Sequence, residues 1–141
     1  MEKEFVPYKL AIKLKELGFD EKCIYYFRKN NKNEFILFQN DLGECYVNAD
    51  FDKVLVWDEY LENPQCSAPL YQQAFRWFRE EHGLFGNPDI SNFENKTYGY
   101  AVTTLNHPHY LFNAHSFSSM EEAELACLDK LIEILTKQQE L

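Results

Sequence analysis

The sequence contains few residues that would make the chain flexible. Its 141 residues include only five glycines and five prolines, which leaves little room for linkers or disordered tails. Twelve phenylalanines, nine tyrosines and two tryptophans supply large apolar side chains for a core. The length and composition therefore predict one ordered domain that spans residues 1–141.

Cysteine is scarce and is not spaced for metal binding. The four cysteines, Cys23, Cys45, Cys66 and Cys127, form no CxxC pair, and three of them lie within apolar runs. We expect reduced thiols that pack as small hydrophobic side chains. Cys66 precedes a predicted helix, whose dipole would lower the pKa of a thiol at that position. Because no local pattern pairs Cys66 with a histidine, the sequence predicts a structural thiol there.

The sequence also has few basic residues and no long apolar run. Fourteen lysines and arginines stand against 23 acidic residues, which gives a net charge of -9. A chain this acidic repels phosphate backbones, so we expect no nucleic-acid partner. No run approaches the ~18 apolar residues of a membrane span, and the N-terminal MEKEFVPYKL lacks a signal-peptide pattern. We therefore expect a cytoplasmic protein that does not contact membranes.

The common catalytic and metal-binding motifs are missing. The sequence contains no GxGxxG, GxxxxGK[ST], HExxH or GxSxG. His107, His109 and His115 are separated by even numbers of residues, which would place them on one face of a regular strand. Pro108 interrupts this strand, and about 26 Å would separate His107 from His115. We expect no catalytic residue, no metal and no cofactor. A non-enzymatic protein is favoured over an enzyme that uses Cys66 or the histidines.

Hydrophobic periodicity and turn residues predict an α+β fold. We expect a single domain with a mainly antiparallel sheet, built from two hairpins plus short strands and packed with three helices. The strands of the first hairpin are apolar at consecutive positions, so their sheet should be covered on both faces or joined to another subunit. The predicted elements are helix 7–17, hairpin 23–27 and 35–38, strands 44–47 and 53–57, helix 67–82, loop 84–94, hairpin 98–104 and 109–116, and helix 119–137.

The segment CSAPLYQQAFRWFREEHG, residues 66–83, carries an unusual amount of aromatic surface. On a helical wheel its apolar side chains cover an arc of roughly 160°, wider than the stripe of about 100° that suits packing on one surface. Such a face either lies between two layers of the fold or leaves some aromatic rings exposed. In the second case Tyr71, Phe75, Arg76, Arg79 and His82 would form a binding surface, because aromatic residues and arginine dominate interface hot spots. The core interpretation is favoured.

Two resemblances add to this picture. Three blocks, EFVPYKLAIKLKELGFDEKC, CSAPLYQQAFRWFREEHGL and SSMEEAELACLDKLIEIL, resemble a group of uncharacterised small proteins that recur in gut bacterial genomes, prophages and bacteriophages. This resemblance implies an accessory role in a mobile element. The ending FSSMEEAELACLDKLIEIL also resembles the final helix of a double-stranded-RNA-binding domain, which packs on a sheet. Glu121, Glu122 and Glu124 stand where that family has basic residues, so RNA binding is not implied.

These observations lead to one main hypothesis and one alternative. The main hypothesis is a non-enzymatic phage or prophage accessory protein that binds a host protein, such as a defence component, or associates with itself as a homodimer. The alternative is a protein that binds a nucleotide signal, with Tyr71, Phe75 and Trp77 stacking on the base and Arg76 or Arg79 holding phosphate.

Overall fold

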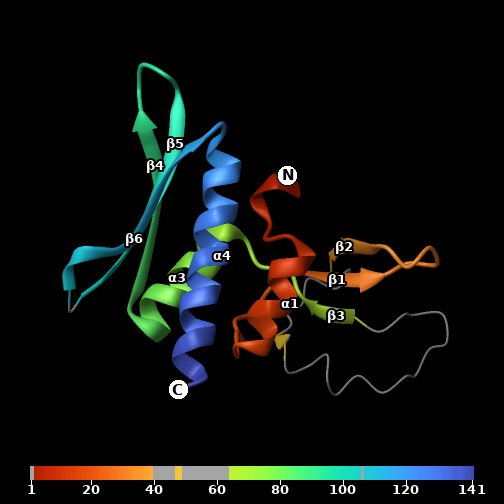
Figure 1. The fold of residues 1–141 in the computed structure, drawn as a ribbon. Coiled ribbons are helices and arrows are strands. Elements are labelled where there is room, and N and C mark those ends of the chain that lie inside the picture. Colours follow the sequence, from red (N-terminus) through yellow and green to blue (C-terminus); the bar gives the residue numbers. More distant parts are fainter. Residues whose placement is uncertain (1, 40–46, 49–63, 106) are drawn as a thin grey trace. The chain divides into compact units, whose positions relative to one another are not determined.

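The computed structural model describes residues 2–39, 47–48, 64–105 and 107–141, which form two compact units (Figure 1). Unit 1 is residues 1–70 and unit 2 is residues 71–141. Each unit combines helices with its own three-stranded antiparallel sheet, so the predicted α+β class is confirmed. The prediction of a single domain over residues 1–141 stays a prediction.

Unit 1 begins with a short 3-10 helix, η1 (Glu2–Glu4), followed by α1 (Tyr8–Glu16). Pro7 precedes the first turn of α1 in an extended conformation, and its carbonyl accepts hydrogen bonds from the backbone of Leu10 and Ala11. Leu10, Ala11 and Leu14 are buried at helical spacing. Gly18, with φ of 97°, ends the helix in the left-handed conformation that glycine adopts most easily. The predicted helix 7–17 is confirmed.

The sheet of unit 1 has the order β2-β1-β3. Its strands are β1 (Tyr25–Lys29), β2 (Phe35–Gln39) and β3 (Pro64–Ser67), and β1 pairs antiparallel with both neighbours. The turn between β1 and β2 is held by Asn30, whose side-chain oxygen accepts hydrogen bonds from the backbone N–H groups of Lys32 and Glu34 at 2.8 and 2.9 Å. Asn33 adopts φ of 62°, which asparagine tolerates better than most residues. The predicted first hairpin is confirmed.

The start of the second helix is a correction. The sequence predicts a helix over residues 67–82, but residues 64–67 form β3 and the helix α3 begins at Tyr71. Cys66 and Ser67 pair with Phe27 and Tyr26 of β1, and the Ser67 N–H donates to Asn48 Oδ1 at 2.8 Å. Ser67 therefore belongs to the sheet, although a serine before a helical pattern is typical of a helix cap.

Unit 2 contains α3 (Tyr71–His82), β4 (Leu84–Asn92), β5 (Thr97–Thr104), β6 (His107–Phe117) and α4 (Met120–Gln139). The strands form an antiparallel sheet in the order β4-β5-β6. Gly83, with φ of 64°, ends α3 as predicted. The predicted second hairpin corresponds to β5 and β6, so it is confirmed.

Strand β4 is a second correction, because the sequence predicts a loop over residues 84–94. Gly86, Asn87 and Pro88 are residue types common in turns, yet all three lie within the strand. A Cβ atom on Gly86 would lie 2.7 Å from Leu131 Cδ1 and 2.9 Å from Cys127 Sγ, so glycine allows α4 to approach β4 closely. Pro88 is tolerated because β4 is an edge strand of the sheet.

Helix α4 packs on β4 and β5, as the resemblance of its sequence to a sheet-packing helix implies (Figure 1). Ser119 caps it by accepting a hydrogen bond from the Glu122 N–H at 3.2 Å, and the Glu122 carboxylate accepts from the Ser118 N–H and hydroxyl at 3.1 and 2.9 Å. The predicted helix 119–137 is confirmed, and Ser119 is its N-cap. Its buried residues are Ala123, Cys127, Leu128, Leu131, Ile132 and Leu135.

The prediction of one sheet is wrong, since the described strands form two sheets. The two strands that the sequence did not predict, β3 and β4, each supply the third strand beside one of the predicted hairpins. Strand patterns identify strands without identifying their pairing partners, which is why the number of sheets was missed. Apart from Val47, the predicted strands 44–47 and 53–57 lie outside the described residues.

Candidate functional site: an exposed hairpin edge

The predicted binding residues on α3 do not lie on one exposed surface. Tyr71 and Phe75 are each only 7% exposed, and their rings stack at 6.2 Å between centroids. Trp77 and Phe78 are also buried, so the aromatic arc of α3 is core, as the favoured interpretation predicts. Burial raises the pKa of Tyr71 to about 12.

The polar members of the same set lie at the surface. Arg76 and Arg79 are exposed, and His82 is partly exposed with its ring 4.6 Å from that of Trp77. Partial burial lowers the pKa of His82, which favours a neutral imidazole. With two of five side chains buried, the set presents arginines and one histidine instead of an aromatic patch. A binding role for these residues stays a prediction.

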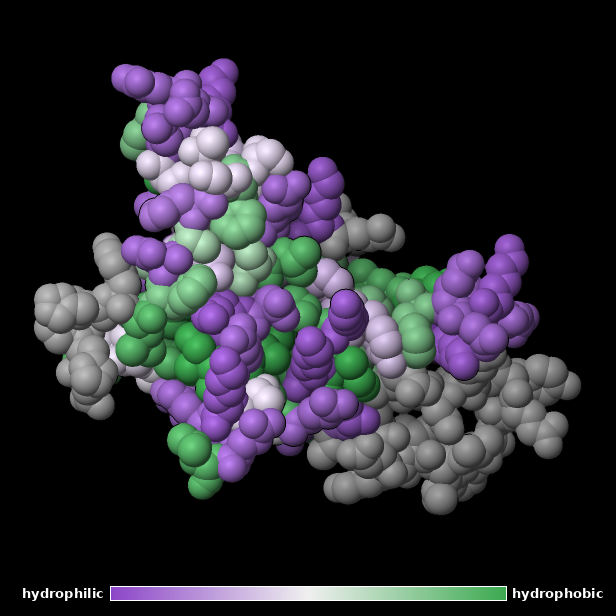
Figure 2. Space-filling view, in the orientation of Figure 1, coloured by the Kyte–Doolittle hydropathy of each residue, from purple (hydrophilic) through white to green (hydrophobic). Residues whose placement is uncertain are grey.

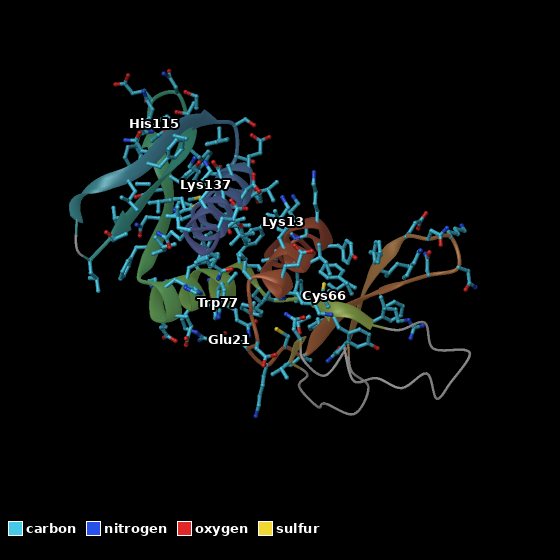
Figure 3. All side chains as sticks on the ribbon, turned by 60° about the horizontal axis from the view of Figure 1, so that its bottom comes forward. Lys13, Glu21, Cys66, Trp77, His115 and Lys137 are labelled. Carbon is cyan, nitrogen blue, oxygen red and sulfur yellow. The ribbon has the colours of Figure 1, made fainter. Side chains whose placement is uncertain are left out.

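Cys66 does not lie where a helix dipole could activate it. It is fully buried in β3, and burial raises the pKa of its thiol to about 12 (Figure 3). The prediction that Cys66 directly precedes a helix is therefore wrong, whereas its interpretation as a structural thiol agrees with its burial. At neutral pH the thiol is protonated and is a poor nucleophile.

The histidines of β6 form no metal site that the structure describes. His115 lies on β6 and is exposed, whereas the side chains of His107 and His109 lie outside the described part of the chain (Figure 3). Within the described ranges, no three His, Cys, Asp or Glu side chains lie close enough together to hold a metal ion. In the same ranges no helix is both long and apolar enough to cross a membrane.

The first hairpin exposes apolar side chains at the edge of a sheet. We call β2, residues 35–39, with its exposed Phe35 and Ile36, the hairpin edge. Phe35 is 37% and Ile36 is 39% exposed, and Ile24, just before β1, is 46% exposed. Among the described strands, β2 pairs only with β1, so its other edge has no partner there. The sequence predicts that this sheet is covered or shared, and in β2 that cover is incomplete.

Aromatic contacts hold the hairpin edge in place. The Tyr8 ring stacks on Phe35 at 3.6 Å between centroids and meets Phe27 edge-on at 5.7 Å. On the opposite face, the Arg28 guanidinium lies 4.2 Å from the centre of the Phe38 ring. The edge is therefore held from both faces of the hairpin.

The tip of the hairpin differs in charge from the rest of the chain. Arg28, Lys29 and Lys32 outnumber Glu34 in this segment, although the whole chain carries a net charge of -9. In Figure 2 the apolar atoms of the hairpin, in green, continue into a hydrophilic tip, in purple. The hairpin thus combines an apolar strand edge with a locally basic end.

In comparisons with protein-family models, curated proteins and solved structures, nothing matched this chain.

Proposed function

We propose that this protein is a non-enzymatic accessory protein of the phage or prophage type that acts by binding a host protein through the hairpin edge. The observation that carries the proposal is a strand, β2, that is an edge among the described strands and has apolar residues more than a third exposed, Phe35 and Ile36. Edge strands with exposed apolar residues readily pair with a strand of another chain. A defence component of the host is the kind of partner that the phage resemblance favours.

The chemistry of the edge defines the partner segment. An extended segment added beside β2 would satisfy the backbone groups of that edge, while its apolar side chains contact Ile36 and Phe35. Lys29 and Lys32 near the turn favour carboxylates at one end of that segment. We therefore propose an acidic and apolar extended segment as the occupant.

The rigidity of the hairpin supports binding by strand addition. Asn30 fixes the turn through two backbone hydrogen bonds, and the Tyr8 ring holds Phe35. A preformed strand loses little conformational entropy when a partner binds. More of the interaction free energy is then available for affinity.

The first prediction concerns Ile36→Lys, which places a charge on the hairpin edge. We expect this variant to lose a partner that the tagged wild-type protein captures from gut-bacterial lysates, because lysine on an edge strand opposes strand pairing. Leu125→Lys is the matched control, since Leu125 is 41% exposed but lies on α4. Quantitative mass spectrometry of the captured proteins measures the effect, and circular dichroism confirms that both variants fold.

Two results would contradict the proposal. If Ile36→Lys and Leu125→Lys retain the same proteins as the wild type, the hairpin edge is not the binding surface. If light scattering instead shows a wild-type dimer that Ile36→Lys converts to a monomer, the edge joins two copies of this chain and not a host protein.

The alternative of nucleotide binding on α3 loses its structural basis. Tyr71, Phe75 and Trp77 were proposed to stack on a base, yet all three rings are buried. A base could reach them only if the core of unit 2 opened. We therefore do not retain α3 as a nucleotide site.

A further inference from the structure

The sheet of unit 2 has two faces of different character. A Cβ atom on Gly86 would point at Cys127 and Leu131, so this face of β4 is turned toward α4. Successive side chains of a strand point to opposite faces, which places Asn87 and Asp89 on the other face. There the sheet is hollowed into a groove of about 400 Å³. We call it the sheet groove; it is lined by Asn87, Asp89, Gly99, Ala101, Asn113 and His115, among others.

Small residues in the central strand create the sheet groove. Gly99 and Ala101 lie on β5, while Asp89 pairs with Gly99 from β4 and Asn113 pairs with Ala101 from β6. Neighbouring strands are about 4.8 Å apart, so the side chains of β4 and β6 stand about 10 Å apart over a low floor. This spacing suits a flat group that lies on the floor between two polar walls.

An irregularity in β6 brings His115 to the groove. Tyr98 pairs with Phe117 and Tyr100 pairs with Ala114, so β6 contains one extra residue between these two pairs. Such a β-bulge re-aims the side chains beside it, and Ser116 has φ of 75°, which is unusual for serine. A Cβ on Gly99 would lie 3.1 Å from His115 Nδ1 and 2.5 Å from the Ala114 carbonyl oxygen. Glycine at position 99 therefore leaves room for the imidazole.

The lining of the groove favours a cation over an anion. Asp89 is its only carboxylate, and none of the described lining residues is a lysine or an arginine. One Asp89 oxygen accepts a hydrogen bond from the Ile90 N–H at 2.7 Å, which orients the carboxylate and leaves the other oxygen for a ligand. The side-chain amides of Asn87 and Asn113 provide further acceptors. A phosphate would find no positive partner in this lining.

We propose that the sheet groove binds a guanidinium group. Guanidinium is flat and cationic, and its five N–H donors match a carboxylate flanked by amide oxygens. The group comes either from a free small molecule or from an arginine side chain of a partner protein, and both present the same chemistry to Asp89. This site is separate from the hairpin edge and does not depend on the function proposed for it.

The second prediction tests this site by nuclear magnetic resonance of the full-length, ¹⁵N-labelled chain. Titration with methylguanidinium or agmatine should give saturable shifts at the backbone amides of Gly99, Ala101 and Asn113. Urea, which is flat but neutral, and methylammonium, which is cationic but not flat, should give no saturable shift at these amides. Asp89→Asn should weaken the affinity by about tenfold or more, because the charge-assisted hydrogen bond is lost.

Two variants serve as controls. Asp129→Asn removes the same charge from the exposed surface of α4 and should leave the affinity unchanged. Ala101→Leu keeps every charge but fills the groove, so it should abolish binding while the remaining spectrum stays that of the folded chain. Equal shifts with methylammonium and methylguanidinium, or an unchanged affinity in Asp89→Asn, would overturn the proposal.

The source of the guanidinium follows from a parallel titration with the peptide acetyl-Gly-Arg-Gly-amide. A peptide that binds at least as tightly as agmatine supports an arginine side chain of a partner protein. Agmatine that binds while the peptide does not supports a free small ligand. If neither probe gives a saturable shift, the groove is not a guanidinium site.

Discussion

At the scale of single residues, two glycines shape the sheet of unit 2. Gly86 faces α4 and allows the Leu131 and Cys127 side chains to contact the strand, whereas Gly99 lies beneath His115 on the other face. Both glycines lie within strands, so neither marks a turn. A glycine within a strand often marks the close approach of another group, and the sequence does not say which group approaches.

The third prediction concerns the aromatic arc of α3. Phe75→Ala should lower the free energy of unfolding by about 3–5 kcal/mol, because the variant leaves a cavity where a buried ring packs near β4. Urea denaturation followed by fluorescence measures the change. Gln72→Ala, an exposed position on the same helix, should change stability by less than about 0.5 kcal/mol. Near-native stability of Phe75→Ala together with lost partner binding would restore the contact-surface interpretation.

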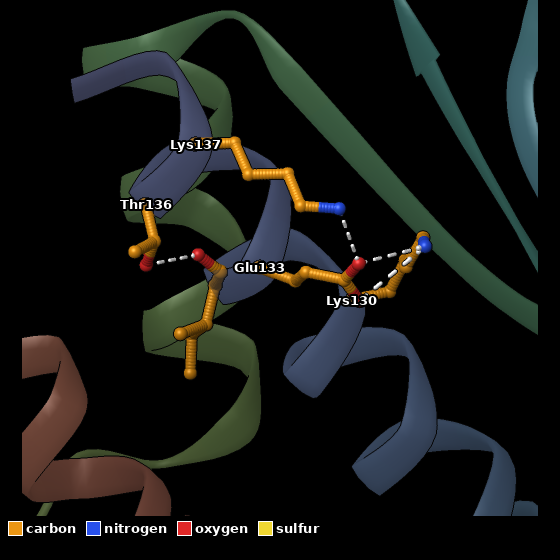
Figure 4. Close-up of polar contacts among 5 residues, drawn as sticks. Lys130, Glu133, Thr136 and Lys137 are labelled. Atoms are coloured by element: carbon orange, nitrogen blue, oxygen red, sulfur yellow. Dashed lines mark hydrogen bonds and ion pairs between the residues drawn. The ribbon is translucent and has the colours of Figure 1, made fainter. Parts of the chain in front are cut away.

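At the scale of elements, local signals decide where helices begin and end. Helix α4 has a serine cap, a glutamate that returns to the residue before the cap, and a buried stripe at helical spacing. Near its C-terminal end the exposed Glu133 accepts hydrogen bonds from Lys130 and Lys137, at 3.3 and 2.9 Å, which lower the pKa of its carboxyl (Figure 4). These interactions are short-range in sequence, so the boundaries of α4 were predicted well.

The fourth prediction concerns the cap of α4. Ser119→Ala should lower the free energy of unfolding by about 0.5–2 kcal/mol, because the Glu122 N–H loses its side-chain acceptor. Thermal and urea denaturation measure this loss. Ser119→Asp keeps an acceptor at the cap and should retain stability close to that of the wild type. Equal losses in the two variants would show that the hydrogen bond does not stabilise the helix.

Strands were predicted less completely than helices, for a reason of scale. The apolar runs in β1, β2 and β5 identify strands by composition, whereas β3 and β4 contain proline, serine or asparagine and resemble turns. Strand β3 is stabilised by pairing with β1, which is distant in sequence. Strand β4 is stabilised by pairing with β5 in the sheet on which α4 packs. Pairing of this kind is a tertiary effect that local patterns do not contain.

At the scale of the whole molecule, buried thiols and tyrosine hydroxyls make the free energy of unfolding depend on pH in the alkaline range. Burial raises the pKa values of Cys66 and Cys127 from 9.0 to about 12, and those of Tyr71 and Tyr100 from 10.0 to about 12. Above pH 9 the unfolded chain releases these protons while the folded chain keeps them. Rising pH therefore favours the unfolded state.

The fifth prediction follows from this linkage. The contribution of these groups to the free energy of unfolding should be complete below about pH 9. The free energy of unfolding should then fall as the pH rises toward 12. Urea denaturation at a series of pH values measures the slope. The double variant Cys66→Ala and Cys127→Ala should lose less stability between pH 9 and 10, because the thiols have the lower unfolded-state pKa, 9.0, and contribute more than the tyrosines in this interval. A free energy of unfolding that stays constant from pH 8 to 11 would contradict the prediction.

The candidate sites were only partly accessible from the sequence. The apolar runs of the first hairpin indicate a sheet that needs a cover, and β2 is an edge of that sheet among the strands that the structure describes. The sheet groove was not foreseen, because Asp89 and His115 lie on different strands and one of these strands was expected to be a loop. In the sequence, His115 is an even number of residues from His107 and His109, a spacing that suggests metal binding and not the groove.

The sequence by itself determined the α+β class, the three described helices with most of their boundaries, the two hairpins and the acidic character of the chain. These depend on composition, periodicity and caps, which act over a few residues. Only the tertiary structure decided that the strands form two sheets, that the rings of Tyr71 and Phe75 are buried, and that a groove lies over Gly99. Each of these depends on which distant segments pack together, because burial and pairing are properties of contacts between segments.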